Sequence, residues 1–328
     1  MTDSLTVAVT GPTGTFGYGL MPRLQADPRV TTVVGIARRP FDPSAEGWTK
    51  MEYRRGDVRD EDALREAFAG ADVVVHLAFL IVGGRKDTTR AINVEGTLNA
   101  FRAAAAAGAE RFVYASSVAA YGFHRDNPVG MTEDWPTRPA DKLFYAQEKA
   151  ELEELLHEEA AKHPEMALYL LRPPVVLGPH TVGGKAMLPG PLAPLNKHLQ
   201  NGFRRLPVPV PAMVPDLPLQ FIHEDDVGRA LLQCVVAAGP PGAYNIAGDG
   251  VLSMVDVARE LRVLPIPLPG RAVQRAARAL SRLPLPSAGE WVEAFSHPAI
   301  MDTTRAKEVL GWEPQFTGLE ALQDTLDS

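Results

Sequence analysis

A glycine-rich turn near the start of the chain is the feature that most limits its fold. Residues 10–17 read Thr-Gly-Pro-Thr-Gly-Thr-Phe-Gly and directly follow the apolar run Leu5–Val9. A turn of this kind, between a first strand and a first helix, brings backbone N–H groups up to a pyrophosphate. The spacing of Gly11, Gly14 and Gly17 differs from the usual dinucleotide fingerprint G-x-G-x-x-G. We therefore expect a strand–turn–helix unit that binds a dinucleotide.

Apolar segments after this turn alternate between strand and helix character. We expect strands over residues 5–9, 31–37, 73–77, 111–115 and 167–171, and helices over 17–26, 61–68, 88–107 and 144–161. This order predicts the α/β class, with a Rossmann-type doubly wound parallel sheet.

The composition of the sequence changes after residue 172, where proline and glycine become frequent. Strand patterns return over 220–223 and 243–246, with helices expected over 225–237 and 251–264. We expect a dinucleotide-binding domain made of residues 1–172 plus 220–247. A smaller, discontinuous substrate-binding region towards the C-terminus would then comprise 173–219 plus 248–328.

A second motif, Tyr145-Ala-Gln-Glu-Lys149, places a phenol and an ammonium four residues apart. On a helix these two side chains share one face, as they also would on an ordinary amphipathic helix. A free phenol has a pKa near ~10, and a neighbouring positive charge lowers it. Tyr145 is thereby suited to exchange a proton with an alcohol or carbonyl while hydride moves to or from a nicotinamide.

Taken together, the glycine spacing and Tyr-x-x-x-Lys resemble the short-chain dehydrogenase/reductase superfamily. Further matches, Asn93-Val-Glu-Gly-Thr, Tyr114-Ala-Ser-Ser and Leu310-Gly-Trp-Glu-Pro, resemble its extended branch, which includes the NAD-dependent epimerases and dehydratases. The resemblance runs from Thr10 to Pro314 and implies a catalytic triad of Ser117, Tyr145 and Lys149.

The end of the second strand indicates which nucleotide the chain prefers. An acidic residue there would bind the ribose 2′-hydroxyl of NAD, whereas arginine accommodates the 2′-phosphate of NADP. The strand ends in Arg38 and Arg39, so we expect NADP to be preferred, with NAD possible and solvated arginines the alternative. The resemblance adds as cofactor-binding residues Thr13, Thr15, Phe16, Asp57, Val58, Leu77, Ala78, Asn93, Ser116 and Pro174, beside the three glycines, Tyr145 and Lys149.

Two departures from the sugar-nucleotide epimerases concern the substrate. Val175 stands where those enzymes have an asparagine, and Leu219 where they have an arginine. The expected substrate region is apolar, with Phe79, Leu80, Ile81, Val82, Met187, Leu188 and Leu192; Arg204 or Arg205 remain possible phosphate contacts. We therefore expect an oxidoreductase that acts on a fairly apolar ketone, aldehyde or secondary alcohol.

Two other functions stay open. A sugar-nucleotide epimerase or dehydratase that works on one bound NAD is favoured by the Gly-Trp-Glu-Pro segment. A non-catalytic dinucleotide sensor would be expected to have a broken Tyr/Lys pair, and the pair is intact here.

Composition bears on partners and location. The net charge of −7, without a long basic run, argues against nucleic acid. No apolar run is long enough to span a bilayer, and little chain precedes the glycine turn, so we expect a cytoplasmic protein. The single cysteine, Cys234, is expected in the core.

Five further assignments complete the predictions. We expect no metal site, and we interpret the glutamates at 151, 153, 154, 158 and 159 as a solvated surface. Asp226 is expected to cap a helix, and the arginines at 271, 275, 278 and 282 to form a solvated helix face. The alanine-rich helix over 97–107 and the helix over 144–161 are expected to form a homodimer interface, as the resemblance implies.

Overall fold

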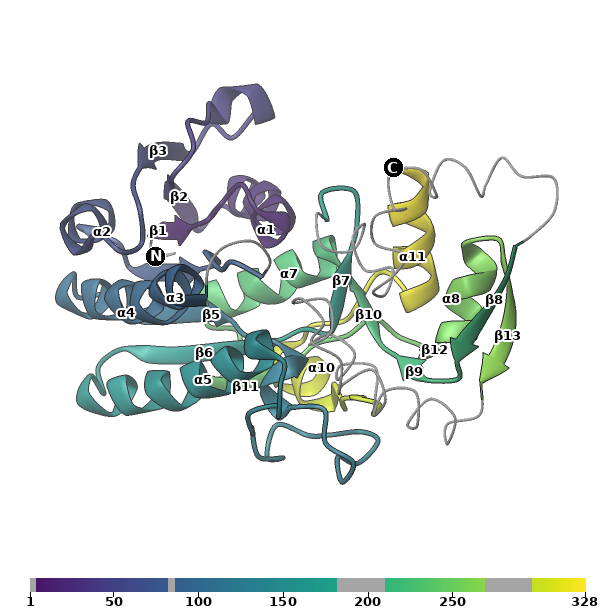
Figure 1. Cartoon of the computed structure of the whole chain (residues 1–328). Coiled ribbons are helices and arrows are strands. Elements are labelled where there is room, and N and C mark those ends of the chain that lie inside the picture. Colours follow the sequence, from purple (N-terminus) through teal and green to yellow (C-terminus); the bar gives the residue numbers. More distant parts are fainter. Residues whose placement is uncertain (1–3, 82–85, 182–209, 269–296) are drawn as a thin grey trace.

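The computed structural model describes residues 4–81, 86–181, 210–268 and 297–328, and is built around a seven-stranded sheet (Figure 1). Its strands are β1 (Leu5–Thr10), β2 (Val30–Ala37), β3 (Met51–Arg55), β4 (Val73–His76), β5 (Arg111–Ala115), β6 (Ala167–Arg172) and β11 (Gly242–Asn245). Their order is β11-β6-β5-β4-β1-β2-β3, and all neighbours are parallel. The chain runs outward from β1 in one direction to β2 and β3, and in the other to β4, β5 and β6. This reversal beside β1 confirms the doubly wound sheet and places the ligand crevice at the carboxyl ends of β1 and β4.

Helices cover both faces of this sheet (Figure 1). One face carries α1 (Thr15–Ala26), α7 (Glu224–Val235) and α10 (Thr304–Leu310), and the other carries α2 (Glu61–Phe68), α4 (Gly96–Ala106) and α5 (Phe144–Lys162). Alternate residues of β1 serve the two layers: Val7 and Val9 pack towards α1, and Ala8 packs towards α4. A sheet buried on both faces explains why its strands read as nearly continuous apolar runs. Cys234 is fully buried in the α7 layer, as predicted.

Helices α1 and α7 touch at two glycines, without intervening side chains. A Cβ added to Gly19 of α1 would lie 2.1 Å from the Glu224 carbonyl oxygen, and one added to Gly228 would lie 1.9 Å from that of Gly19. These contacts fix α1, and with it the glycine turn, against α7.

Smaller elements lie beyond the carboxyl ends of the central strands, together with α11 (Gly318–Asp327) (Figure 1). Strands β7 (Val175–Leu177) and β10 (Phe221–His223) pair in parallel outside the central sheet. Further out, β8 (Val210–Pro215) pairs with β13 (Val263–Leu268), and β9 (Pro218–Leu219) with β12 (Leu252–Ser253). The division of the chain into two domains stays a prediction.

The prediction of one helix over 251–264 was wrong. Only α8 (Met254–Glu260) is helical; β12 precedes it and β13 follows it. The left-handed backbone of Arg262, with φ of 56°, ends the helical path, and Pro265 and Pro267 cannot continue a helix. Strand β3, which has two arginines at its exposed end, was not predicted either.

Two assignments of acidic residues were also wrong. Glu153 and Glu159 are buried, because Arg172 and Arg102 reach them from neighbouring elements. Asp226 does not cap α7, since His223 occupies the N-cap; its carboxylate instead accepts hydrogen bonds from the N–H groups of Gln315 and Phe316.

Two features are absent from the residues that the structure describes. None of the helices in this part of the chain has the length and apolarity needed to cross a membrane. Across the same residues, no three His, Cys, Asp or Glu side chains gather as they would around a metal ion.

Candidate active site

The glycine turn joins β1 to α1 and has the shape of a phosphate cradle. Gly11 has a φ of 67°, and a Cβ there would lie 3.1 Å from the backbone of Ala78, so the loop that follows β4 lies directly behind the turn. A Cβ on Gly17 would lie 2.0 Å from the Pro12 carbonyl oxygen, which only glycine permits. Gly14 is the N-cap residue of α1, and α1 has no acidic residue in its first turn.

Gly14 tests whether this cradle suits a nucleotide. A Cβ on Gly14 would meet only the Gly11 carbonyl oxygen, at 3.4 Å, which is ordinary contact. Internal packing therefore does not demand glycine at this exposed position, and the missing side chain leaves the backbone open to close approach by an external group. The first N–H groups of α1, from Thr15 onward, point out of the helix end at the switch point of the sheet. The turn fits the pyrophosphate of a dinucleotide.

His76 at the end of β4 is structural. Its ring nitrogens pair with the hydroxyls of Thr10, at 2.9 Å, and Thr97, at 3.1 Å. Complete burial and the nearby charge of Lys149 lower the pKa of His76 to about 3, so the ring is neutral. The Thr10 hydroxyl also accepts the N–H groups of Leu77 and Ala78, which fixes the loop after β4 beside the glycine turn.

The three predicted catalytic residues converge at the carboxyl end of β5. Ser117 caps the short helix η3 (Val118–Tyr121), and its Oγ accepts the N–H of Ala119 at 3.1 Å. Tyr145 lies in the first turn of α5, and a hydrogen bond with Ser117 lowers its pKa, although burial dominates and raises it to about 12. Lys149 follows one turn later, 2% exposed, with its Nζ 6.0 Å from the centroid of the Tyr145 ring.

Both polar and aromatic groups surround the Lys149 ammonium. Its ammonium donates to the Tyr114 hydroxyl at 2.9 Å and to the Ala115 carbonyl oxygen at 2.8 Å. Burial lowers the pKa of Lys149 to about 7, against the opposing effect of the carboxylates of Glu153 and Glu148. An ammonium with this pKa changes its charge near neutral pH.

A buried polar network supports this site from behind. The Ser116 hydroxyl donates to Glu153 Oε1 at 2.5 Å, so it points away from Tyr145 and towards the interior. Arg172 Nε donates to the same carboxylate at 2.9 Å, and Arg172 Nη1 donates to the Tyr121 hydroxyl at 2.7 Å. Tyr121 in turn donates to Asn245 Oδ1 at 2.8 Å. The network ties the end of β5 to α5, β6 and β11. This network was not predicted, although the arginine that ends a buried strand, Arg172, indicates that a buried acidic partner must lie near it.

The loop that follows β6 reaches the same place. The Val118 N–H donates to the Pro173 carbonyl oxygen at 2.9 Å, which brings the buried Pro174 next to η3. Val175, Leu219 and Leu252 pack beyond it on a small apolar cluster that includes Phe221.

Arginines gather at the carboxyl ends of β2 and β3, around Asp57. Arg59 holds the Asp57 carboxylate with two bonds, of 3.0 and 2.8 Å, and these lower the pKa of Asp57. The nearby charge of Arg38 lowers it further. Arg55, which the sequence analysis did not single out, donates from Nε to the Arg38 carbonyl oxygen at 3.0 Å.

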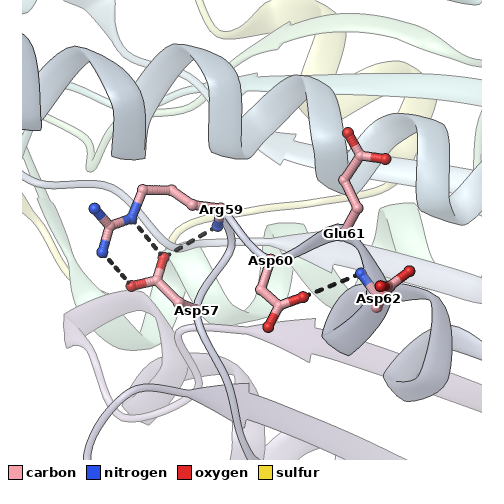
Figure 2. Close-up of a pocket in the computed structure, with 5 residues that line it drawn as sticks. All are labelled: Asp57, Arg59, Asp60, Glu61 and Asp62. Carbon is pink, nitrogen blue, oxygen red and sulfur yellow. Dashed lines mark hydrogen bonds and ion pairs between the residues drawn. The ribbon is translucent and has the colours of Figure 1, made fainter.

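Figure 2 shows the Asp57–Arg59 pair on one wall of a pocket at this end of the sheet. Asp60, Glu61 and Asp62, at the start of α2, form the rest of the lining. The Asp60 carboxylate accepts the N–H groups of Asp62 and Ala63 and so caps the helix. Arg38 and Arg39 are exposed directly after β2, and the charge of Arg38 acts on Asp57 at the edge of this pocket.

The structure therefore brings most of the predicted site residues to one edge of the sheet. Thr13, Thr15 and Phe16 lie on the glycine turn and the start of α1, Val58 is buried after β3, and Asn93 is buried behind the β4 loop. Val82, Met187, Leu188, Leu192, Arg204, Arg205 and the four arginines at 271–282 lie outside the described residues.

Comparison with solved structures shows which folds share this arrangement. The match with the crystal structure of gox2253 covers 98% of this chain and 97% of the other, at 22% identity and a TM-score of 0.76. The UDP-glucose 4-epimerase of Thermotoga maritima covers 98% of both chains, at 19% identity and a TM-score of 0.72. These likenesses confirm the Rossmann-type fold.

Sequence comparison identifies the family. "Uncharacterized protein Rv0501" of Mycobacterium tuberculosis is 29% identical over 332 residues, which span 97% of this chain and 82% of that protein. An undecaprenol-linked sugar 4-epimerase of Escherichia coli O157:H7, named N-acetyl-alpha-D-glucosaminyl-diphospho-ditrans,octacis-undecaprenol 4-epimerase, is 37% identical over 134 residues, or 39% of this chain and 38% of that one. The family model of the NAD dependent epimerases and dehydratases matches residues 7–247. The glycine cradle, the Tyr/Lys pair and this match agree: the chain is an enzyme of the NAD dependent epimerase/dehydratase family.

Proposed function

We propose that this chain is an NADP(H)-preferring oxidoreductase that interconverts a fairly apolar ketone or aldehyde and its alcohol. The observation that carries the proposal is the convergence of Ser117, Tyr145 and Lys149 at the carboxyl end of β5, which only β4 separates from β1 and its glycine turn. A bound nicotinamide would supply or accept the hydride. The chemistry left to the protein is to orient the carbonyl oxygen and to move one proton.

Each of the three residues has a distinct part in that chemistry. The Ser117 hydroxyl orients the substrate oxygen, and the Tyr145 hydroxyl gives it a proton or takes one from it. Burial keeps the Tyr145 phenol protonated, with a pKa of about 12, which suits donation to a carbonyl. In the oxidative direction the Lys149 ammonium favours the phenolate, and because the pKa of Lys149 is about 7, that help declines above neutral pH.

The arginines around Asp57 support the preference for NADP(H). Arg38 and Arg39 are exposed directly after β2, at the place in the sequence where an acidic residue would bind the ribose 2′-hydroxyl of NAD. Guanidinium groups bind phosphate with paired hydrogen bonds, and Arg55 adds a third positive charge at this edge. Thr13, Thr15 and Phe16 would bind the pyrophosphate with the glycines, and Leu77, Ala78 and Pro174 would border the nicotinamide.

A fairly apolar substrate follows from the residues beyond β6. Val175 and Leu219 pack together with Leu252 in an apolar cluster and offer no group for a diphosphate. The chain's fold likeness to the Thermotoga maritima UDP-glucose 4-epimerase favours a second candidate, a sugar-nucleotide epimerase or dehydratase that retains NAD.

The nucleotide released from the purified, desalted and denatured protein separates the two candidates. An oxidoreductase exchanges its cofactor in each turnover, so we expect empty protein or traces of NADP. Titration of the emptied protein should then give a lower Kd for NADPH than for NADH. In a separate assay, the protein should oxidise NADPH when apolar aldehydes and ketones such as 4-nitrobenzaldehyde are added. Near-stoichiometric NAD would instead establish the epimerase or dehydratase.

The proposal includes a homodimer through α4 and α5, on the strength of the resemblance. Ion pairs join this helix layer internally, from Arg90 to Glu151 at 2.5 Å and from Arg102 to Glu159 at 2.8 Å. Sedimentation velocity at micromolar concentration tests the dimer, and a single monomeric species would exclude it.

A further inference from the structure

A second set of contacts leads from helix α5 back to Tyr145 and Lys149 through the loop after β4. Glu148, between these two residues in sequence, binds Asn93; Asn93 binds Leu80; and Phe79, beside Leu80, packs on Lys149. We propose that Glu148 is a positioning residue of this site, which acts through Asn93 to hold the Phe79 ring against Lys149. The proposal deepens the proposed function and rests on it for the roles of Tyr145 and Lys149.

The link between Glu148 and Asn93 is buried and directional. The two side chains are 1% and 0% exposed, and Asn93 Nδ2 donates to Glu148 Oε2 at 2.8 Å. Because an ionised carboxylate only accepts, it requires the NH₂ side of the Asn93 amide to face it. The carbonyl side of the amide is then left for the N–H of Leu80. Glu148 thus selects the orientation of the Asn93 amide.

Asn93 comes from a five-residue π-helical turn, η2 (Ala91–Glu95), between α3 (Lys86–Arg90) and α4. With this orientation it binds both backbone groups of Leu80: Oδ1 accepts the N–H at 2.8 Å, and Nδ2 donates to the carbonyl oxygen at 3.0 Å. π-helical turns occur frequently at functional sites, where they redirect a side chain. In the loop after β4, the Asn93 amide thus makes the two backbone hydrogen bonds that a neighbouring strand would make within a sheet.

Phe79 links this set of contacts back to Lys149 and Tyr145. Its ring centroid lies 3.7 Å from Lys149 Nζ and 5.6 Å from the Tyr145 ring centroid, with the two rings at 87°. A cation over an aromatic face is stabilised, most strongly where water is excluded. The ring therefore offsets part of the cost of burying the Lys149 ammonium, and it borders the Tyr145 ring edge-on.

Burial raises the pKa of Glu148, and the ionised form of Glu148 acts on Lys149 in the same direction as the Phe79 ring. Groups that face Lys149 are the carboxylates of Glu148 and Glu153, which raise its pKa, and the hydroxyl of Tyr114, to which it donates. The neutral His76 lies near it as well. Glu148 itself faces Asn93, Arg90, Lys149 and Glu151. Removing its charge leaves Lys149 with Glu153 as the remaining carboxylate that raises its pKa.

Nuclear magnetic resonance of the protein labelled with ¹³C-lysine tests the proposal without cofactor or substrate. The chain has eight lysines, so Lys149→Arg identifies the Lys149 signal. The Phe79 ring should shift the ε-CH₂ protons of Lys149 upfield, and Phe79→Leu defines their position without the ring. We expect Glu148→Ala to move the signal most of the way to the Phe79→Leu position.

Two further variants separate positioning from charge. Glu148→Gln keeps an oxygen for Asn93, so the ring shift should stay while the titration midpoint of Lys149 falls by about one pH unit. Asn93→Asp opposes two carboxylates and removes the donor, so it should lose the ring shift as Glu148→Ala does. The matched control is Glu151→Gln, on the partly exposed side of α5, which should change neither quantity.

A Lys149 signal that keeps its wild-type position in folded Glu148→Ala or Asn93→Asp overturns the proposal. If Glu148→Ala fails to fold, Asn93→Asp decides it; if both fail, loss of the ring shift in Glu148→Gln overturns it and retention supports it. Because the measurement needs no nucleotide, a failed nucleotide titration contradicts the proposed function and leaves this result standing.

Discussion

Arg172 and Glu153 form a buried ion pair in which Nη2 and Oε2 are 2.5 Å apart and neither side chain is more than 5% exposed. Burial opposes the charge of Arg172, and the Glu153 carboxylate more than compensates, so the pKa of Arg172 is raised. The same carboxylate accepts the hydroxyl of Ser116, next to the predicted catalytic Ser117. Stability and the geometry of the site therefore depend on one carboxylate.

Glu153→Gln should lower the free energy of unfolding by about 3–5 kcal/mol, because it leaves a buried guanidinium without its counter-charge. Urea unfolding followed by circular dichroism measures this. The control is Glu151→Gln, which breaks the partly exposed pair with Arg90 and should cost at most about 1 kcal/mol. Equal losses in the two variants would contradict the importance of the buried pair.

His76 predicts how stability depends on pH. Its pKa is about 3 in the folded protein and near 6.5 when unfolded, so the unfolded state binds more protons between these values. Stability from this residue is therefore complete above pH 6.5 and is lost as the pH falls towards 3, by about 1.4 kcal/mol per pH unit. His76→Gln should show a shallower loss between pH 6 and pH 4 in urea titrations, and an unchanged slope would contradict this assignment.

The sheet was predictable from the sequence because its strands are buried on both faces and read as apolar runs. Val73–His76 illustrates this, with all four residues buried. Strand β3, by contrast, lies at the sheet edge and alternates apolar Met51 and Tyr53 with charged residues, a pattern too short to distinguish from a loop. The sequence of β13 contains two prolines and has no local pattern that is typical of a strand. Only its pairing with β8 makes this segment a strand.

The candidate site shows the same division. Spacing on one helix related Tyr145 to Lys149, and the end of a strand pointed to Ser117. Nothing local relates Glu148 to Asn93, which are 55 residues apart and meet only because α4 and α5 pack side by side. The glutamates of α5 looked like a solvated surface for the same reason, since the arginines that bury Glu153 and Glu159 come from β6 and α4.

Arg38→Ala tests the proposed preference for NADP(H). The substitution should raise the Kd for NADPH by roughly 10- to 100-fold, since a hydrogen bond to a charged group contributes about 1.5–3 kcal/mol. The Kd for NADH should change little, because NADH carries no 2′-phosphate. Fluorescence titration measures both, with Arg65→Ala on the exposed surface of α2 as control. Equal weakening of both nucleotides would show that Arg38 does not select the phosphate.

Tyr145→Phe tests the proposed proton transfer. With a carbonyl that the NADPH screen identifies, kcat should fall by about 10²- to 10⁴-fold, the usual contribution of a positioned acid or base. The Kd for NADPH and the unfolding temperature should stay close to those of the wild type, because the buried ring is kept. Tyr169→Phe, which loses a hydrogen bond to the Gly239 carbonyl oxygen in the segment before β11, is a matched control. Unchanged kcat in Tyr145→Phe would remove Tyr145 from the mechanism.

The glycine cradle makes opposite predictions for two of its residues. Gly14→Ala adds a methyl group whose nearest neighbour, the Gly11 carbonyl oxygen, lies 3.4 Å away, so the free energy of unfolding should change by less than about 1 kcal/mol. The same methyl occupies the place where a pyrophosphate would approach, so nucleotide affinity should fall at least about tenfold. Gly17→Ala would put its Cβ 2.0 Å from the Pro12 carbonyl oxygen, so it should destabilise the fold itself. Urea unfolding and nucleotide titration of both variants separate the two effects. If Gly14→Ala bound nucleotide as the wild type does, the phosphate would have to lie elsewhere than on this turn.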